Sequence, residues 1–261
     1  MTGVQTCALP ISGTLFVLGD EGDALAEVTK QGALVSSMTL TGFDDTEGLT
    51  YVGNGQFVLV EERLQTLYKF SYTAGGSISR GALQSADLDG QLQGVGNVGT
   101  EGVSFDPRDG TFVTVKEKTP QEVRRHTVDF GAGTATSMSI FPPSGLGLLD
   151  LSDVPVLAAV PSLIGTPDEG NLLIFSQESA KLYEVNATGS ILSAFDFSLL
   201  SSSAEGVTID ADGIIYVVDE SPTLYVLAPV PLPAAVWLLG SGLLGAAGVF
   251  RRRGTLRPQT A

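Results

Sequence analysis

Short runs of apolar residues recur along this chain, and polar turn signals separate them. The runs are rich in β-branched and aromatic residues and span about four to eight positions, which is typical of strands. Neighbouring runs are joined by the Asn-Gly and Asp-Gly pairs that favour tight hairpins; these pairs are Asn54-Gly55, Asp109-Gly110 and Asp212-Gly213. No segment before Ala234 has the periodicity of a long amphipathic helix. The pattern therefore predicts an all-β chain.

An acidic motif repeats at the start of several of these runs. Its first copy reads Thr46-Glu47-Gly48-Leu49-Thr50-Tyr51, and it recurs at residues 100–105 and 204–209, with a degenerate copy at 151–154. The acids of the motif lie about 52 to 54 positions apart and are Glu47, Glu101, Asp153 and Glu205. Self-similarity at a fixed spacing of this size indicates a repeat architecture.

A second motif follows each copy and consists of an apolar strand that ends in an acid. An example is Phe57-Val58-Leu59-Val60-Glu61-Glu62. The closing acids share one register and are Glu21, Glu62, Glu117, Glu178 and Glu220. A third strand, such as residues 66–70, follows most copies. About four strands in a repeat of about 50 residues is the size of a propeller blade.

We therefore predict a β-propeller of about five four-stranded blades over residues 13–228, with six blades as the alternative. The first blade is expected to lack its innermost strand, and the last blade its outermost. In each blade the first strand lines the central channel and the second runs back antiparallel to it. Both sets of acids should then face one funnel at the end of that channel.

A ring of carboxylates in one funnel predicts a cation site. Two unit charges about 6 Å apart repel by about 3 kcal/mol at an effective dielectric near 20. The acids should therefore take up protons, pair with Lys or Arg, or bind a cation, and Ca²⁺ suits oxygen ligands at variable spacing. The candidate ligands are Glu47, Glu101, Asp153, Glu205, Glu21, Glu62, Glu117, Glu178 and Glu220. The alternative is that these carboxylates only cap backbone N–H groups where strands begin.

Charge and composition exclude several other functions. The chain has 14 Lys and Arg residues against 29 Asp and Glu residues, for a net charge of −15. So acidic a surface repels phosphate backbones, and we expect no nucleic-acid partner. With one cysteine and one histidine, His126, the chain offers no zinc site of the His-rich kind and no internal disulfide. No Gly-x-Ser-x-Gly nucleophile elbow is present, and we predict no catalytic residue.

The first residues do not read as a signal peptide, because they have no basic start and no sustained apolar run. The string Met1–Ile11 resembles the translation of a sequencing-library adapter. We therefore expect residues 1–12 to be non-native, together with Cys7, and the native start with any signal peptide to be missing. A natural, disordered N-terminus is the alternative.

The C-terminal segment, residues 229–261, predicts a membrane anchor. Residues 234–250 carry no charge and would form a helix of about 26 Å, enough for a thin bilayer core. The arginines after it mark the cytoplasmic side. The segment resembles the VPLPA variant of the PEP-CTERM sorting signals, which implies recognition by an exosortase in a Gram-negative bacterium. The residues that carry this resemblance are Val230, Pro231, Leu232, Pro233, Ala234, Arg251, Arg252 and Arg253.

The repeats themselves resemble the SdiA-regulated family of bacterial β-propellers. The order Glu-Gly-Leu-Thr-Tyr, then Phe-Val-Leu-Val-Glu-Glu, then Leu-Tyr carries the resemblance, which covers most of residues 14–227. It implies an exported or membrane-tethered propeller, and one branch of the family is linked to calcium response. The broader relatives include phytase-like propellers.

These observations predict an envelope-anchored propeller that acts as a binding or scaffold module and holds Ca²⁺ in its funnel. A Ca²⁺-dependent phosphoester hydrolase of the phytase-like kind is one alternative, and a surface or extracellular-matrix structural protein is another. We expect the propeller to face the periplasm from the inner membrane, or to reach the cell surface after sorting. Its ligand or protein partner is not identified by the sequence.

Overall fold

Strands make up most of the regular structure. The computed structural model describes residues 6–11, 13–19, 24–88 and 98–228. In these residues the helical elements are short 3-10 turns, such as η2 (Pro143–Leu146). No helix among them is both long enough and apolar enough to cross a bilayer. The prediction of an all-β chain is confirmed, whereas the predicted helix at 234–250 lies outside the described residues.

Hydrogen bonds join the described strands into four sheets. The first sheet contains β1 (Thr6–Ile11), β2 (Thr14–Leu18), β3 (Ala24–Thr29), β4 (Leu34–Thr41) and β8 (Ser77–Ser79). The second contains β5 (Thr46–Gly53), β6 (Gln56–Glu61), β7 (Thr66–Ser71), β9 (Gln84–Asp87), β10 (Thr100–Asp106), β11 (Thr111–Lys116), β12 (Glu122–Asp129) and β13 (Thr134–Phe141). The third contains β14 (Leu172–Ser176), β15 (Lys181–Val185) and β16 (Ile191–Asp196), and the fourth β17 (Ala204–Ile209), β18 (Ile215–Asp219) and β19 (Thr223–Leu227).

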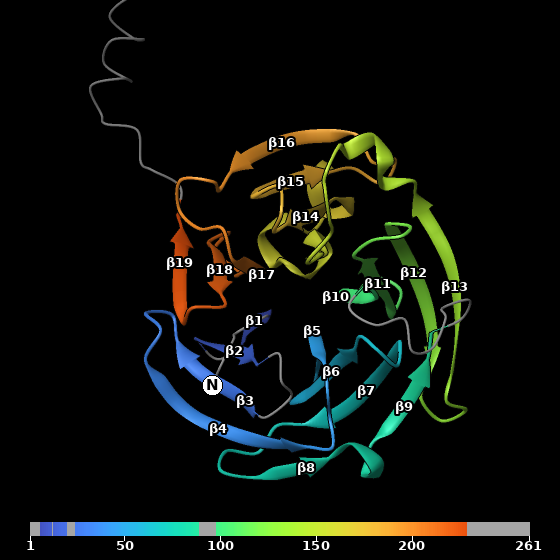
Figure 1. The fold of residues 1–261 in the computed structure, drawn as a ribbon, viewed down its shortest axis with the longest axis vertical. Coiled ribbons are helices and arrows are strands. Elements are labelled where there is room, and N and C mark those ends of the chain that lie inside the picture. The colour runs from blue at the N-terminus through green and yellow to red at the C-terminus, as the bar shows by residue number, and fades with distance from the viewer. Residues whose placement is uncertain (1–5, 12, 20–23, 89–97, 229–261) are drawn as a thin grey trace, which may run out of the picture. The chain divides into compact units, whose positions relative to one another are not determined.

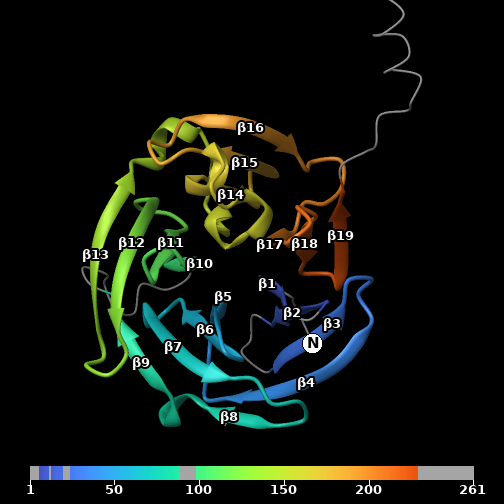
Figure 2. The ribbon, with the colours of Figure 1, turned by 180° about the vertical axis from the view of Figure 1, so that it is seen from behind.

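Antiparallel runs of strands surround a central axis like the blades of a propeller (Figure 1). Strands β1, β5, β10 and β17 lie near the centre in both views, and β4, β8, β13 and β16 lie at the periphery (Figure 2). The eight-stranded sheet is two such runs, β5–β7 with β9 and β10–β13, joined by a single parallel pairing of Thr134 with Asp87. Next to β14, Asp153 and Val156 form isolated bridges and take the inner position.

The hairpin signals of the sequence form tight turns. Asn54 and Gly55 join β5 to β6 with φ angles of 53° and 73°. Two positive φ values in a two-residue loop match the right-handed twist of the flanking strands, and Asn and Gly are the residues that adopt them most readily. Gly110 and Gly213 also have positive φ values, 75° and 79°, in the turns predicted around them.

The first and last sheets meet and close the ring. Buried Leu15 of the first sheet packs with Tyr216 and Val218 of the last. Lys30 Nζ lies 2.6 Å from Asp210 Oδ2, and this ion pair also joins the two sheets. Burial of apolar residues between successive sheets is the main stabilising contribution to the fold, at about 25 cal/mol per Å².

Strand β1 occupies the inner position of the first sheet. It pairs antiparallel with β2 and contacts β5 and β17. The expectation that the first blade lacks an inner strand therefore differs from the structure, because residues 6–11 fill that place. The physical reason is that β2 would otherwise present an unpaired edge at the channel, which a neighbouring extended segment satisfies. The non-native origin of residues 1–12 stays a prediction.

The hydroxyl of the repeated Glu-Gly motif links an inner strand to the next one at two of its copies. The backbone N–H of Phe105 in β10 donates to Thr50 Oγ1 in β5 at 3.0 Å. The N–H of Val156 donates to Ser104 Oγ in β10, also at 3.0 Å. Thr50 and Ser104 are the same position of the motif and both are buried. These bonds satisfy N–H groups that the antiparallel pairing leaves free at the axis.

The glycine of the motif is required by a close approach of neighbouring inner strands. A Cβ added at Gly48 would lie 2.6 Å from the Val103 nitrogen and 2.7 Å from the Glu101 oxygen. A Cβ at Gly102 would lie 2.7 Å from the Asp153 Cα. These neighbours are backbone atoms and cannot rotate away, so only glycine fits at either position.

We predict that Gly48→Ala destabilises the propeller by about 1–3 kcal/mol, because the added methyl overpacks the axis. Gly145→Ala is the matched control, since a Cβ there meets nothing within 4 Å. Urea unfolding of both variants and the parent measures the difference. Equal midpoints for the two variants would contradict the close approach at Gly48.

Candidate functional site

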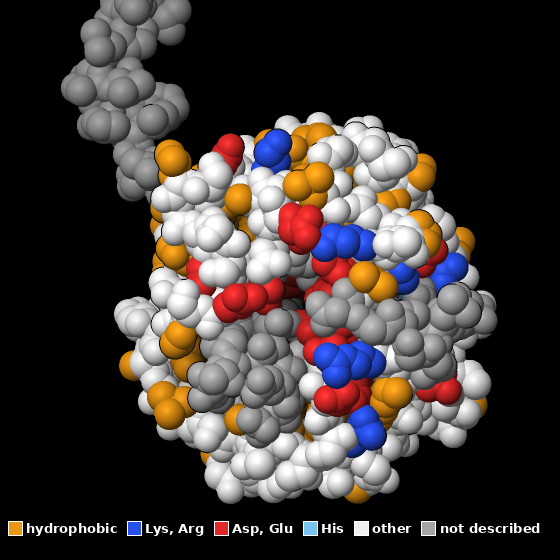
Figure 3. Space-filling model, in the orientation of Figure 1, with side chains coloured by type: hydrophobic (Ala, Val, Ile, Leu, Met, Phe, Trp, Pro, Cys, Tyr) orange, Lys and Arg blue, Asp and Glu red, His pale blue; other side chains and the backbone are white. Residues whose placement is uncertain are grey.

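Carboxylates gather at the centre of one face of the propeller, with Lys and Arg side chains beside them (Figure 3). Their source is the repeated pair of motifs. Glu47 and Glu101 lie near the starts of the inner strands β5 and β10. Glu62 and Glu117 directly follow β6 and β11, which run back to the same end. The predicted convergence of the two sets of acids is therefore observed for these four residues.

The acids form two overlapping groups. In the first trio, Asp45, Glu47 and Glu62, the carboxylate oxygens lie within 4.8 Å of one another. In the second trio, Glu62, Glu101 and Glu117, the same limit holds. Glu62 belongs to both, and either trio could hold a metal ion. The first trio is buried, whereas Glu101 and Glu117 of the second are partly exposed.

Asp45 is a member that the sequence analysis missed. It precedes the repeated motif by one residue and has no acidic counterpart in the copies at Glu101 and Glu205. A search based on repetition therefore passes over it. The available signal was the pair Asp44-Asp45 immediately before Thr46, which makes the first copy of the motif the most acidic one.

Glu62 is held in place by backbone and side-chain contacts. The N–H of Gly99 donates to Glu62 Oε1, and the Gln65 side chain donates to the Glu62 carbonyl. Gln65 in turn accepts a hydrogen bond of 2.8 Å from Thr100 Oγ1, at the start of β10. A Cβ at Gly99 would lie 2.8 Å from Glu62 Cγ, so a glycine is needed here. Glu62 itself has no exposed surface, and its Oε2 has no hydrogen-bond partner among the described residues.

Burial and mutual repulsion raise the pKa of the central carboxyls. Burial raises the pKa of Glu62 from 4.5 to about 8, despite the opposing hydrogen bond from Gly99. Burial, followed by repulsion from Glu101 and other acids, raises the pKa of Glu47 well above its usual range. The pKa of Glu101 is raised in the same way, by burial and then by Glu62, Glu117 and Glu205. Such shifts in one cluster are typical of functional sites and of cation sites.

Basic side chains pair with the outer acid of each trio and neutralise part of its negative charge. Arg63 Nε lies 2.9 Å from Asp45 Oδ2, and Arg63 also pairs with Asp44. Lys118 Nζ lies 2.6 Å from Glu117 Oε1 and 2.6 Å from Glu178 Oε1. Both basic residues are partly exposed, so they hold the rim of the site rather than its centre.

Glu205 lies in the same electrostatic environment, because its charge acts on Glu47 and Glu101. Its Oε1 accepts a hydrogen bond of 2.7 Å from Gln177 Nε2. Glu220 is exposed, with its Oε1 3.5 Å from the same Gln177 nitrogen. Neither residue is a member of the two trios. Glu178 is likewise outside them and lies at the rim, paired with Lys118, and Glu21 lies outside the described residues.

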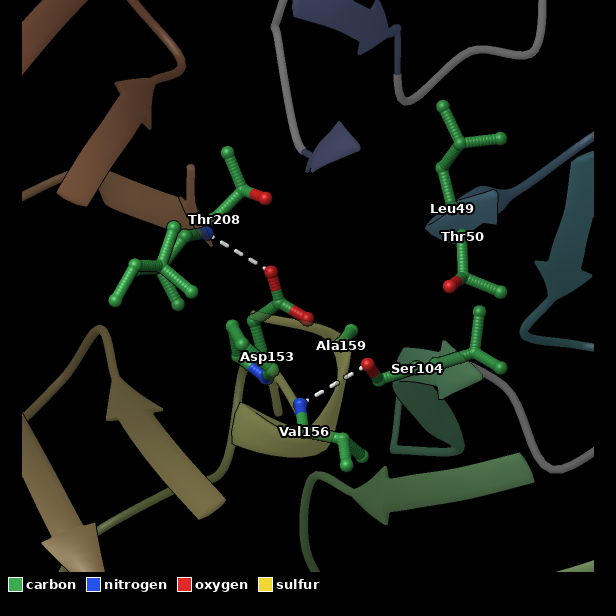
Figure 4. Close-up of a pocket in the computed structure, with 11 residues that line it drawn as sticks. Leu49, Thr50, Ser104, Asp153, Val156, Ala159 and Thr208 are labelled. Atoms are coloured by element: carbon green, nitrogen blue, oxygen red, sulfur yellow. Dashed lines mark hydrogen bonds between the residues drawn. The ribbon is translucent and has the colours of Figure 1, made fainter. Parts of the chain in front are cut away.

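Asp153 faces the central channel and is already satisfied. It lines a small cavity of about 20 Å³ together with Thr50, Ser104 and Thr208 (Figure 4). Its carboxylate accepts the N–H of Val154 and that of Val207, each at 2.8 Å. Burial raises its pKa to about 7, and the two N–H bonds oppose the shift. The geometry of Asp153 is therefore that of the alternative we predicted, in which the carboxylate caps backbone N–H groups where strands begin.

The arrangement defines a β-propeller protein with an acidic, cation-competent funnel. Three solved structures share the fold with the chain. A glutaminyl cyclase from Myxococcus xanthus is 13% identical, with a TM-score of 0.57 over 87% of this chain and 92% of that one. The WD40 β-propeller domain of Doa1 is 10% identical, with a TM-score of 0.52 over 88% and 93%. A luciferin-regenerating enzyme is 10% identical, with a TM-score of 0.51 over 85% of each chain.

The family follows from the sequence of the folded part. The SdiA-regulated family model matches residues 9–228, so the chain belongs to the SdiA-regulated family. The resemblance drawn from the repeated motifs is thereby confirmed for the propeller. The identities to the solved structures are low, and those likenesses concern the fold alone.

We predict that the chelator-treated protein loses stability as pH rises from about 4.5 to about 8. In that interval the folded chain keeps a proton on Glu62 that the unfolded chain releases, since the pKa values are about 8 and 4.5. The stability is fully present below pH 4.5 and is lost through pH 8. Glu62→Gln should reduce the slope without removing it, because the pKa values of Glu47, Glu101 and Asp153 are also raised. Exposed Glu220→Gln should leave the slope unchanged. Urea midpoints across pH 4.5–9 measure it, and a stability that rises over this interval would contradict the shift.

Proposed function

We propose that the chain is a non-enzymatic binding or scaffold propeller that is held at the cell envelope and binds Ca²⁺ in its central funnel. Membership of the SdiA-regulated family and the propeller-like fold support the module. The observation that carries the cation is the first trio. It places three buried carboxylates within 4.8 Å of one another.

The ionised acids of the first trio repel one another. Each pair of ionised carboxylates at this separation repels by about 3 kcal/mol even at an effective dielectric near 20. Asp45 has Arg63 as a partner, but Glu47 and Glu62 are surrounded by further acids. A divalent cation replaces that repulsion by attraction. Carboxylates on neighbouring turns of a repeat offer hard oxygens in irregular geometry, which suits Ca²⁺ better than the octahedral demand of Mg²⁺.

We propose five blades for the propeller. The order of contacts around the axis supports this number: β5 lies between β1 and β10, and β17 contacts both β1 and β14. Each of these inner strands, or the bridge segment 153–156 beside β14, begins one antiparallel run. The last run has three strands within the described residues.

Envelope anchoring rests on the sequence of residues 229–261, which lie outside the described residues. Residues 234–250 carry no charge, and three arginines follow them. This is the order of a membrane helix and the basic residues that mark its cytoplasmic end. We propose that the tail attaches the propeller to the inner membrane, facing the periplasm, and that an exosortase is its partner. Sorting to the cell surface would follow in a Gram-negative bacterium.

A Ca²⁺-dependent phosphoester hydrolase is a second candidate function. The observation in its favour is that basic side chains flank the acids on the funnel face (Figure 3). A bound cation could polarise a phosphate there while Arg63 and Lys118 contact its oxygens. Both basic residues are held in ion pairs with acids, which weakens this role. Release of phosphate from a panel of phosphoesters with and without Ca²⁺ separates the hydrolase from the binding module.

We predict that Ca²⁺ raises the thermal midpoint of the propeller. At one hundred times the dissociation constant the gain is about 2.7 kcal/mol, or about 5 to 10 °C for a domain of this size. Glu47→Gln, in the first trio, should remove most of the shift while keeping the side-chain shape. Thermal melts of both proteins in chelator and in millimolar Ca²⁺ test this, and equal shifts would end the role of Glu47.

We predict that residues 229–261 tether a secreted reporter to the inner membrane when no exosortase is present. Replacing the three arginines after Phe250 by serine is the matched control, because it removes the charges that define the cytoplasmic side. Cell fractionation measures the reporter. Free release of the reporter with the intact tail would refute the anchor.

A further inference from the structure

Exposed apolar side chains gather where the outer strands of the last two sheets meet. Leu199 is 96% exposed and Leu200 is 44% exposed, and both lie in the loop that joins β16 to β17. Phe195 near the end of β16 is 42% exposed, and Val226 of β19 is 48% exposed. These four residues form the apolar patch. Within the described residues, no strand pairs with the outer side of β19.

Contacts between the loop and β19 make the apolar patch one surface. The Tyr225 hydroxyl donates to the Leu200 carbonyl at 3.0 Å. The ring of buried Phe197 has its centroid 5.5 Å from that of Tyr225 and 5.6 Å from that of Phe195. The ends of β16 and β19 accordingly lie side by side at the periphery in both views (Figures 1 and 2). Val226 continues the patch on the other face of β19, because successive side chains of a strand alternate.

The apolar patch lies among uncharged residues in a strongly acidic chain. Residues 197–203 and 221–228 carry no charged side chain, although the net charge of the chain is −15. From Lys181 to Arg251 the sequence has no Lys or Arg between the two. The patch therefore offers apolar contact and no electrostatic attraction to an anionic partner. A continuous exposed apolar surface of this kind is typical of an interaction site, whereas single exposed apolar residues are ordinary.

The sequence after β19 indicates what the apolar patch meets. β19 ends at Leu227, and only residues 229–233 separate Ala228 from the uncharged stretch 234–250. Fully extended, the chain spans at most about 20 Å from Ala228 to Ala234, at about 3.3 to 3.6 Å per residue. When the stretch is in a bilayer, the end of β19 and the patch beside it are kept next to the membrane surface.

We infer that the apolar patch is a lipid-docking surface, through which the propeller lies against the outer face of the membrane that anchors it. The inference rests on the proposed anchor and adds a second membrane contact and an orientation of the propeller. The tail holds the chain at the bilayer, so docking of the patch is an intramolecular step. A small apolar surface is then sufficient, because the effective concentration of lipid is high.

The chemistry of the apolar patch suits the interface of the bilayer and not its hydrocarbon core. Apolar side chains such as Leu199 are stabilised about 5 to 10 Å into the boundary of headgroups and acyl chains. The free backbone groups on the outer side of β19 need hydrogen bonds, which headgroups and water supply and hydrocarbon does not. The Tyr225 hydroxyl already has its partner in the protein.

Fluorescence of the full chain in phosphatidylcholine vesicles tests the inference. In a Cys7→Ser background, an environment-sensitive label is attached at Leu199→Cys or at Met138→Cys. Met138 is the matched control, because it is apolar and 64% exposed and belongs to β13, across the axis from β19 (Figure 1). The label at 199 should shift to the blue and be quenched by lipids brominated near the headgroup. The label at 138 should show neither change.

A label at exposed Ser202→Cys, in the same loop, reports on the contribution of the leucine. Leu199→Ser should weaken the docking equilibrium about tenfold, which is the effect of keeping one leucine side chain in water. Met138→Ser should leave the quenching at 202 unchanged. Added phosphatidylglycerol should not increase the quenching, since the patch has no basic residues to attract anionic lipid.

Flotation of the same vesicles distinguishes the inference from the anchor on which it rests. A chain that does not float with the vesicles would overturn both. A chain that floats with equal signals at 199 and 138 would leave the anchor standing and overturn the docking surface. A blue shift without quenching by brominated lipid would mean that protein, such as a second copy, covers the patch. Quenching that requires phosphatidylglycerol would overturn the apolar contact.

Discussion

The close approach of inner strands at the propeller axis is the constraint on which the site depends. Gly48 and Gly102 lie against the backbone of the next inner strand, where no Cβ can be accommodated. The residue before each glycine is an acid, Glu47 or Glu101. The same approach that removes the side chain at one position therefore brings carboxylates from neighbouring strands together. The glycine of the motif permits the close approach of the inner strands, and the acid beside it is brought close to other acids by the same approach.

Neighbouring acids have different roles because successive strand positions face different surroundings. Glu61 is buried, and its Oε1 lies 2.6 Å from Arg80 Nη1 and accepts the Asp44 N–H. Glu62, one residue later, faces the funnel and other carboxylates. The first is held by an ion pair of the fold through Oε1. Each of the two residues keeps its Oε2 without a hydrogen bond among the described residues, but Glu62 has acids as its neighbours, and it is the group that a proton or a cation stabilises.

The ring is assembled by a small set of links that repeat from one inner strand to the next. Thr50 and Ser104 accept the N–H groups of their neighbours, and Asp153 accepts that of Val207. In the degenerate copy of the motif, where Asp153 stands in place of Glu, the carboxylate binds the next inner strand and does not join the funnel acids. This exchange explains why the acidic cluster occupies one side of the axis, around β5, β6, β10 and β11.

The repeated motifs by themselves determined the all-β class, the hairpin at Asn54-Gly55 and the family, because strand periodicity, turn chemistry and motif order are local properties of the chain. They also indicated Glu47 and Glu101, which share one position of the repeat, and Glu62 and Glu117, which share another. Only the tertiary structure places Asp45 in the acidic cluster and makes Glu62 a member of both trios. It also places Asp153 at the channel, apart from the funnel acids. Those outcomes depend on distances between side chains that are remote in sequence, within one blade for Asp45 and between blades for Glu62 and Asp153. Such distances are decided by how closely the backbones pack at the axis, and no spacing along the chain encodes them.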